Sequence, residues 1–199
     1  MDSTLNLRGT EPTALITLSS ALERALTLNG APQRPVVFAC IGTDRSTGDA
    51  LGPLVGQRLR RLGCPEESVI GTLEEPLHAL NLAERLGPLA AADPRPLVIA
   101  IDAALGASSN VGSITLRPGG LKPGQGVGKA LPEVGELSIT ATVNVSAGAL
   151  DAQVLQSTRL FMVQELAETI GTACWWSLRM VRRGAADRSI RATATAAAA

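Results

Sequence analysis

Short apolar runs alternate with helical patterns along most of the chain. Two runs, Pro35–Ile41 and Leu97–Ile101, contain no polar residue, which is typical of strands covered on both faces. Three further strands are predicted at Ser68–Leu73, Gly112–Leu116 and Leu137–Val143. Apolar residues at helical spacing predict helices at residues 13–28, 49–62, 76–86 and 150–170.

This alternation predicts the architecture. Strands that alternate with helices form βαβ units, so we expect a three-layer α/β/α fold with a mostly parallel sheet. In such folds ligands bind outside the carboxyl ends of the strands. The loops that follow the predicted strands are therefore the places to search for a site.

The predicted strands define one domain at residues 35–171, in a chain of 199 residues. Residues 1–34 form an N-terminal extension with one helix. Residues 172–199 form a basic C-terminal extension, with five arginines and one aspartate. Its end, residues 191–199, lacks large apolar side chains, so we expect that end to be disordered.

Composition excludes several classes of partner. The 18 basic and 18 acidic residues balance, so no net charge draws the chain to nucleic acid or to a membrane surface. Two Phe and two Trp are too few for a base-stacking surface. The longest uncharged stretches, Ala103–Leu116 and Leu137–Leu150, fall short of the ~20 apolar residues of a membrane-spanning helix.

The N-terminus and the cysteines indicate the compartment. No basic segment precedes the first apolar stretch, so we expect no signal peptide and a cytoplasmic location. Cys40, Cys64 and Cys174 are far apart and odd in number, which predicts reduced, buried thiols.

Acidic and hydroxyl side chains crowd the loop after the first predicted strand: Asp44, Ser46, Thr47 and Asp49. Asp49 stands where the next helix begins, and a helix N-terminus favours negative charge. An Asp there is equally well explained as a helix cap, which stabilises by ~1 kcal/mol without any catalytic role. Two acids in the loop, and the lack of a Gly-x-Gly-x-x-Gly motif, argue against phosphate binding.

Asp102 follows the apolar run Leu97–Ile101 directly. An acid at the carboxyl end of a buried strand is poorly solvated and needs partners. If the two unbroken apolar strands are neighbours, Asp49 and Asp102 face each other across the strand ends. Close carboxylates have pKa values that split, which suits one to act as a general acid and the other as a general base.

His78 is the chain's one histidine and lies in the segment Glu74–His78, after another predicted strand. A lone histidine is more often a packing residue than a ligand. Its place after a strand nevertheless favours a role for His78 in the site. With Asp49 and Asp102 it would form a set of one imidazole and two carboxylates able to bind a divalent metal.

Residues 117–136 are rich in Gly and Pro and predict a long ordered loop. The run Gly124–Lys129 is not a Walker loop, because Pro123 stands where a glycine is needed and Ala130 replaces the metal-binding hydroxyl. We expect a flap that contacts substrate or a second subunit, which leaves a homo-oligomer open. No Gly-x-Ser-x-Gly motif supports a serine nucleophile.

These segments resemble known sporulation proteins. Ser46–Pro53 and Ile99–Ala103 resemble the two aspartate segments of bacterial spore germination protease. A fuller match is to its smaller relatives, the YyaC-like sporulation proteins, and it covers about residues 35–171. The matching segments are Cys40–Gly56, Gly71–Leu82, Leu121–Gly135, Asn144-Val145 and Gln156–Leu160.

The resemblance implies a phosphorylase/hydrolase-like α/β/α fold, shared with germination protease and more distantly with hydrogenase-maturation peptidases. It implies peptide hydrolysis by an aspartate pair, here Asp49 and Asp102. The implied substrate is a protein or peptide, such as a small acid-soluble spore protein, in the forespore or mother-cell cytoplasm. In hydrogenase-maturation peptidases the site histidine follows the second acid, whereas His78 precedes Asp102, so a nickel-type site transfers poorly.

We therefore predict a sporulation-associated peptidase that needs no cofactor. The residues predicted to shape the site or bind substrate are Asp44, Thr47, Glu75, His78 and Asn144. Two alternatives stay open. One is a metal-dependent hydrolase that uses Asp49, Asp102 and His78. The other is a non-enzymatic protein that binds a partner through the cleft or through residues 117–136.

Overall fold

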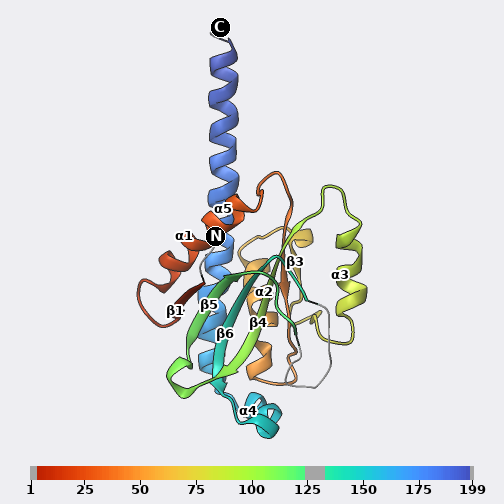
Figure 1. The fold of residues 1–199 in the computed structure, drawn as a ribbon, viewed down its shortest axis with the longest axis vertical. Helices are drawn as coiled ribbons and strands as arrows, with labels where there is room; N and C mark the ends of the chain where they lie inside the picture. Colours follow the sequence, from red (N-terminus) through yellow and green to blue (C-terminus); the bar gives the residue numbers. More distant parts are fainter. Residues whose placement is uncertain (1–3, 124–132, 198–199) are drawn as a thin grey trace.

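A mixed β-sheet forms the middle layer of the molecule (Figure 1). The computed structural model describes residues 4–123 and 133–197, with side chains up to Asp187. Its six strands lie in the order β1-β5-β6-β4-β2-β3, with β6, β4, β2 and β3 parallel and β1 and β5 antiparallel to their neighbours. The predicted fold, with its mostly parallel sheet, is confirmed. The strands are β1 (Leu5–Arg8), β2 (Val36–Cys40), β3 (Val69–Ile70), β4 (Leu97–Gly106), β5 (Ser113–Pro118) and β6 (Leu137–Val145).

Helices cover both faces of this sheet. The larger core packs one face, through residues such as Phe38 and Ile101, against α1, α2 and α5. On the other face Ala100 packs in a smaller core with Leu82 of α3 and with Leu121. The helices are α1 (Ala14–Leu28), α2 (Leu51–Arg61), α3 (Leu82–Ala90), α4 (Asp151–Gln156) and α5 (Leu160–Ala197).

The N-terminal segment packs into this domain. Strand β1 pairs with β5 at one edge of the sheet. Leu18, Leu22 and Leu26 of α1 are fully buried at helical spacing, as the apolar pattern predicts. The hydroxyl of Ser177 in α5 donates to the carbonyl oxygen of Ser19 at 3.0 Å, which joins the two helices.

The predicted helix at residues 76–86 is wrong in its position. Helix α3 begins only at Leu82. Leu77 is instead drawn to the sheet, where it forms a parallel bridge with Ile41. The side chain of Asn81 then ends the irregular segment, because its Oδ1 accepts a hydrogen bond from the His78 N–H at 2.9 Å. The predicted strand at residues 68–73 is also shorter, with only Val69 and Ile70 paired.

The single helix predicted at residues 150–170 is two helices. Helix α4 ends at Gln156 and α5 begins at Leu160. Between them the Ser157 and Thr158 hydroxyls donate to the carbonyl oxygens of Gln153 and Val154, at 2.9 and 2.8 Å. These bonds offer the backbone an alternative to helix continuation.

Helix α5 continues far past the sheet (Figure 1). It runs to Ala197, so the end predicted to be disordered is helical as far as that residue. Val181 is the last buried side chain among those described. None of the described helices combines the length and the apolar character needed to cross a membrane.

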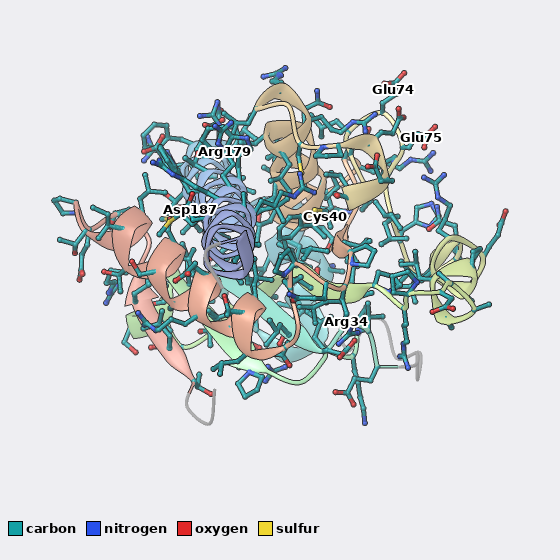
Figure 2. The ribbon with its side chains drawn as sticks, turned by 90° about the horizontal axis from the view of Figure 1, so that it is seen from above. Arg34, Cys40, Glu74, Glu75, Arg179 and Asp187 are labelled. Atoms are coloured by element: carbon teal, nitrogen blue, oxygen red, sulfur yellow. The ribbon has the colours of Figure 1, made fainter. Side chains whose placement is uncertain are left out.

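All three cysteines are buried and free, as predicted. Cys40 lies in the interior of the molecule (Figure 2). Burial raises the pKa of the Cys40, Cys64 and Cys174 thiols. They are therefore packing residues and not reactive thiolates.

Candidate active site

The sheet opens between β2 and β4 at the carboxyl ends of its parallel strands. The Ile41 N–H still donates to the Ile101 carbonyl oxygen at 2.7 Å. The next N–H, that of Gly42, donates instead to the carbonyl oxygen of Leu77 at 2.8 Å, so the chain turns away from β4. β4 continues beside β6 to Gly106. The opening lies where parallel α/β sheets bind their ligands.

Asp102 stands in β4 at the start of this opening. It pairs with Thr140 of β6 and is the first residue of β4 beyond the part paired with β2. The sequence places it just after the strand. It lies instead inside the strand, because β6 pairs with β4 through Asp102 and on to Gly106. The Asp102 Oδ1 accepts a hydrogen bond from the Ala103 N–H at 2.8 Å.

Asp49 reaches the same opening from the other side. It lies in a single 3-10 turn, Gly48–Ala50, that leads into α2. Neither this turn nor α2 has a side-chain cap hydrogen bond, so the helix-cap explanation for Asp49 is not supported. The turn is fixed through its backbone, because the Asp49 carbonyl oxygen accepts a hydrogen bond from the Thr43 N–H at 3.1 Å.

Two glycines allow the Asp49 turn to pack closely. A Cβ on Gly52 would stand 2.0 Å from the Ile41 carbonyl oxygen, so the first turn of α2 rests directly on the end of β2. A Cβ on Gly48 would stand 2.8 Å from the Leu155 side chain and 3.0 Å from the Thr158 hydroxyl. The Asp49 turn is therefore held between β2 and the α4 segment.

Burial perturbs both carboxyl groups, and repulsion by Asp49 adds to the perturbation of Asp102. Burial raises the pKa of Asp49. The pKa of Asp102 is raised well above its ordinary value, first by burial and then by the nearby charge of Asp49, against a smaller lowering by the Ala103 N–H. Asp102 is therefore the better proton holder of the pair, and Asp49 the better base.

His78 lines the same opening as the two aspartates. Its Nδ1 atom is buried and has no hydrogen-bond partner among the described residues. Even so, no three His, Cys, Asp or Glu side chains in the described part of the chain are placed to hold one metal ion. As placed here, Asp49, Asp102 and His78 do not fit a shared metal.

The opening is a cleft of about 660 Å³. One wall comes from α4 and the residues before it, Ser146, Asp151, Ala152 and Leu155. The other wall carries two cations, Arg117 of β5 and Lys122. The Arg117 Nε donates to the buried Ser138 hydroxyl at 3.1 Å, which fixes the base of the guanidinium. The cleft therefore combines an acidic centre with a basic side.

The remaining predicted site residues lie outside the cleft. Asp44 and Glu75 are exposed, and Glu75 forms an ion pair with Arg85 at 2.8 Å. Figure 2 shows Glu74 and Glu75 at the periphery of the molecule. Thr47 precedes the Asp49 turn. Asn144 contacts the α4 segment, since its Nδ2 donates to the Val154 carbonyl oxygen at 3.4 Å and to the Thr158 hydroxyl at 3.2 Å.

Some cleft residues carry no distinguishing signal in the sequence. Arg117, Lys122 and Pro123 belong to the predicted flap at residues 117–136, but no pattern marks them individually. The glycine run Gly124–Gly128 and Lys129 lie outside the described residues. The apolar pattern assigns Asp151 and Leu155 to a continuous helix, which indicates no cleft wall. The break at Ser157–Thr158, with two adjacent hydroxyl residues, is the signal that marks it.

The comparisons with known proteins place the chain in a family. Residues 6–173 match the family model described as "Protein of unknown function (DUF1256)". A Bacillus subtilis (strain 168) protein described as "Uncharacterized protein YyaC" is 47% identical over 153 residues, covering 77% of this chain and 71% of that protein. The chain belongs to this family. The predicted resemblance to the YyaC-like proteins is confirmed.

A solved structure shares the fold. It is described as a [NiFe] hydrogenase maturation protease, HycI from Thermococcus kodakarensis KOD1. The TM-score is 0.55 at 19% identity, with 80% of this chain and 99% of that chain covered. At this identity the likeness establishes the α/β architecture alone.

Proposed function

We propose that this protein is a peptidase whose Asp49 and Asp102 activate a water molecule for attack on a peptide bond. The observation that carries the proposal is the coupled pair itself: two partly buried carboxyl groups from separate elements line one cleft, and the charge of Asp49 raises the pKa of Asp102. The HycI-like fold is consistent with this activity.

The different pKa values assign the roles in the proposed reaction. Asp49 is the general base and takes a proton from water, while the oxygen of that water attacks the carbonyl carbon. Asp102, protonated, gives its proton to the carbonyl oxygen to form a neutral gem-diol. When the C–N bond breaks, the proton on Asp49 passes to the leaving nitrogen, and Asp102 recovers its proton from the gem-diol hydroxyl.

The physiological role follows the family. The relative from a Bacillus species and the resemblance to spore germination protease support a role in sporulation. The proposed substrate is a small acid-soluble spore protein. Such a protein presents accessible peptide bonds to a cleft that has both an acidic centre and a basic side.

The test is cleavage of a purified small acid-soluble spore protein, followed by mass spectrometry. We expect cleavage by the wild type, and losses of about 10²- to 10⁴-fold for Asp49→Asn and for Asp102→Asn. The matched control is Asp93→Asn, which removes an exposed carboxylate that does not line the cleft. Equal cleavage by all four proteins, or none by the wild type, would contradict the proposal.

The same assay addresses metal dependence. Because the described residues do not assemble a metal site, activity should survive a chelator. Loss of activity with chelator, restored by a divalent ion, would favour the hydrolase that uses Asp49, Asp102 and His78. Binding of the substrate protein without cleavage would favour the partner-binding alternative.

A further inference from the structure

Strand β4 has an open edge beside the aspartate pair. β2 accompanies β4 only to Ile101, whereas β6 continues with it to Gly106. In the part of the chain that the structure describes, no strand pairs with residues 103–106 on the side that β2 has left. Unpaired backbone groups at a strand edge are a template for another strand.

The directions of the backbone groups on this edge follow from two hydrogen bonds. In a strand these groups point alternately to the two neighbouring strands. The Ile101 carbonyl oxygen accepts from Ile41, on the β2 side. The Gly106 carbonyl oxygen accepts from the Ser146 N–H at 2.9 Å, on the β6 side. The N–H and carbonyl groups of Ala103 and Leu105 therefore face the side that β2 has left.

One of these four groups already has a partner. The Ala103 N–H donates to the Asp102 Oδ1 at 2.8 Å. Within residues 4–123 and 133–197 nothing bonds to the Ala103 carbonyl or to either group of Leu105, so these three groups can bind a ligand. These residues also line the cleft, together with Asp49 and Asp102. Ala79 and Ala152, which line the same cleft of about 660 Å³, have small side chains that leave room for a main chain.

We propose that an extended segment of a protein substrate binds as an added strand on the Ala103–Leu105 edge of β4. A substrate N–H donates to the Ala103 carbonyl oxygen, and a substrate carbonyl oxygen accepts from the Leu105 N–H. Main-chain bonds of this kind supply affinity with little dependence on sequence. They also bring a neighbouring peptide bond to Asp102, which directly precedes the edge.

This inference rests on the proposed function and names the substrate class. The ligand is the main chain of an unfolded or extended segment. A folded surface does not fit, because its backbone groups are already paired. A segment with proline at the position that bonds Ala103 is rejected, since proline has no N–H.

Two variants at one position test the edge. Leu105→Pro removes the N–H that points away from the β6 ladder, and proline is tolerated at such edge positions. Leu105→Ala loses the same side chain but keeps the N–H, so it is the reference. Both are made in Asp102→Asn protein, in which the asparagine oxygen can still accept from Ala103 and bound peptides are not consumed.

The probe is a phage-displayed library of linear peptides, selected on Asp102→Asn protein. Enriched peptides are synthesised, and their affinities for the two double variants are measured. We expect roughly ten-fold weaker binding to the Leu105→Pro protein than to the Leu105→Ala protein, as for one lost hydrogen bond. Equal affinities, or no enriched peptide at all, would overturn the inference.

A second measurement tests the inference if the Leu105→Pro protein fails to fold. Deuterium exchange at the Leu105 amide of Asp102→Asn protein should slow when an enriched peptide binds. An unchanged rate overturns the added strand.

Failure of the proposed function looks different. If the peptides bind through the Leu105 N–H but the wild type cleaves none of them, the added strand is supported and the proposed peptidase activity is refuted. If the wild type cleaves them while the two Leu105 variants bind them equally, the peptidase activity is supported and the added strand is refuted.

Discussion

Gly52 offers a strong test of how Asp49 is positioned. A Cβ added at this residue would stand 2.0 Å from the carbonyl oxygen of Ile41, and 2.7 Å from both its carbonyl carbon and its nitrogen. Real contacts of this kind are essentially never below 3.0 Å, so in Gly52→Ala α2 and β2 must separate by about 1 Å. The obstacle is backbone, and no side-chain rotation relieves it.

The expected cost is at the upper end of what overpacking causes. Overpacked cores lose about 1–3 kcal/mol, and more where the backbone must move. We therefore expect Gly52→Ala to lower the free energy of unfolding by at least about 3 kcal/mol, measured by urea titration. Because Asp49 lies in the turn that leads into α2, the shift also moves it relative to Asp102. A displacement of about 1 Å costs on the order of 10²-fold in rate.

Gly87→Ala is the matched control. Gly87 lies in α3, and a Cβ there has no neighbour within 4 Å. Alanine is the better helix former, so this variant should gain up to about 1 kcal/mol and keep its activity. A Gly52→Ala protein as stable and as active as Gly87→Ala would refute the close contact between α2 and β2.

Three further predictions concern stability. Because the pKa of Asp102 is raised in the folded state, this residue makes the wild type less stable as pH rises from about 4. Asp102→Asn should remove this loss, so its advantage in urea titrations should grow by about 1.4 kcal/mol per pH unit until the pH reaches the raised pKa. An advantage that does not change with pH would contradict this. Arg34 lowers the pKa of Glu136 and also donates to three backbone carbonyl oxygens. Arg34→Lys should therefore lower the free energy of unfolding by about 1–2 kcal/mol above pH 5, and the part due to Glu136 should fade as pH falls through the lowered pKa. An equal cost at pH 3 and pH 7 would contradict this. Removing residues 185–199 should change the melting temperature by less than about 2 °C, because the last buried side chain described is Val181; a larger loss would mean that this end packs against the domain.

The sheet could be predicted from the sequence because its central strands are unbroken apolar runs. Val36–Cys40 and Leu97–Ile101 lie inside the predicted ranges, since both faces of each strand are buried. The ends of strands were harder to predict. β4 extends five residues past Ile101, to Gly106, because β6 continues beside it, and nothing local in Asp102–Gly106 indicates that partner.

The helices that differ from the prediction depend on tertiary contacts. The apolar spacing in residues 76–86 is helical, but Leu77 is stabilised instead by its bridge to Ile41 beside the sheet. After Gly171 the apolar pattern weakens because small residues carry part of it, yet Ala173, Cys174, Ser177, Leu178 and Val181 are still buried. Beyond Val181 the helix continues because alanine and arginine are good helix formers even without a face to bury.

The candidate site could be predicted only in its acidic centre. Asp49 and Asp102 stand out because a charged side chain next to a buried strand is costly unless it has a partner or a function. Glu75 has an equally suggestive place after a strand, but it pairs with Arg85 at the surface. Spacing alone does not distinguish a carboxylate that turns inward from one that turns outward.

The central claim is that Asp49 and Asp102 titrate as one coupled pair. Carbon-13 NMR of the side-chain carboxyl groups measures this directly, in the wild type and in Asp49→Asn. We predict that Asp102 titrates well above an ordinary aspartate in the wild type. In Asp49→Asn its pKa should fall, yet stay above the ordinary value, since the repulsion is gone and the burial remains. An Asp102 pKa that is ordinary in the wild type, or identical in the two proteins, would contradict the account.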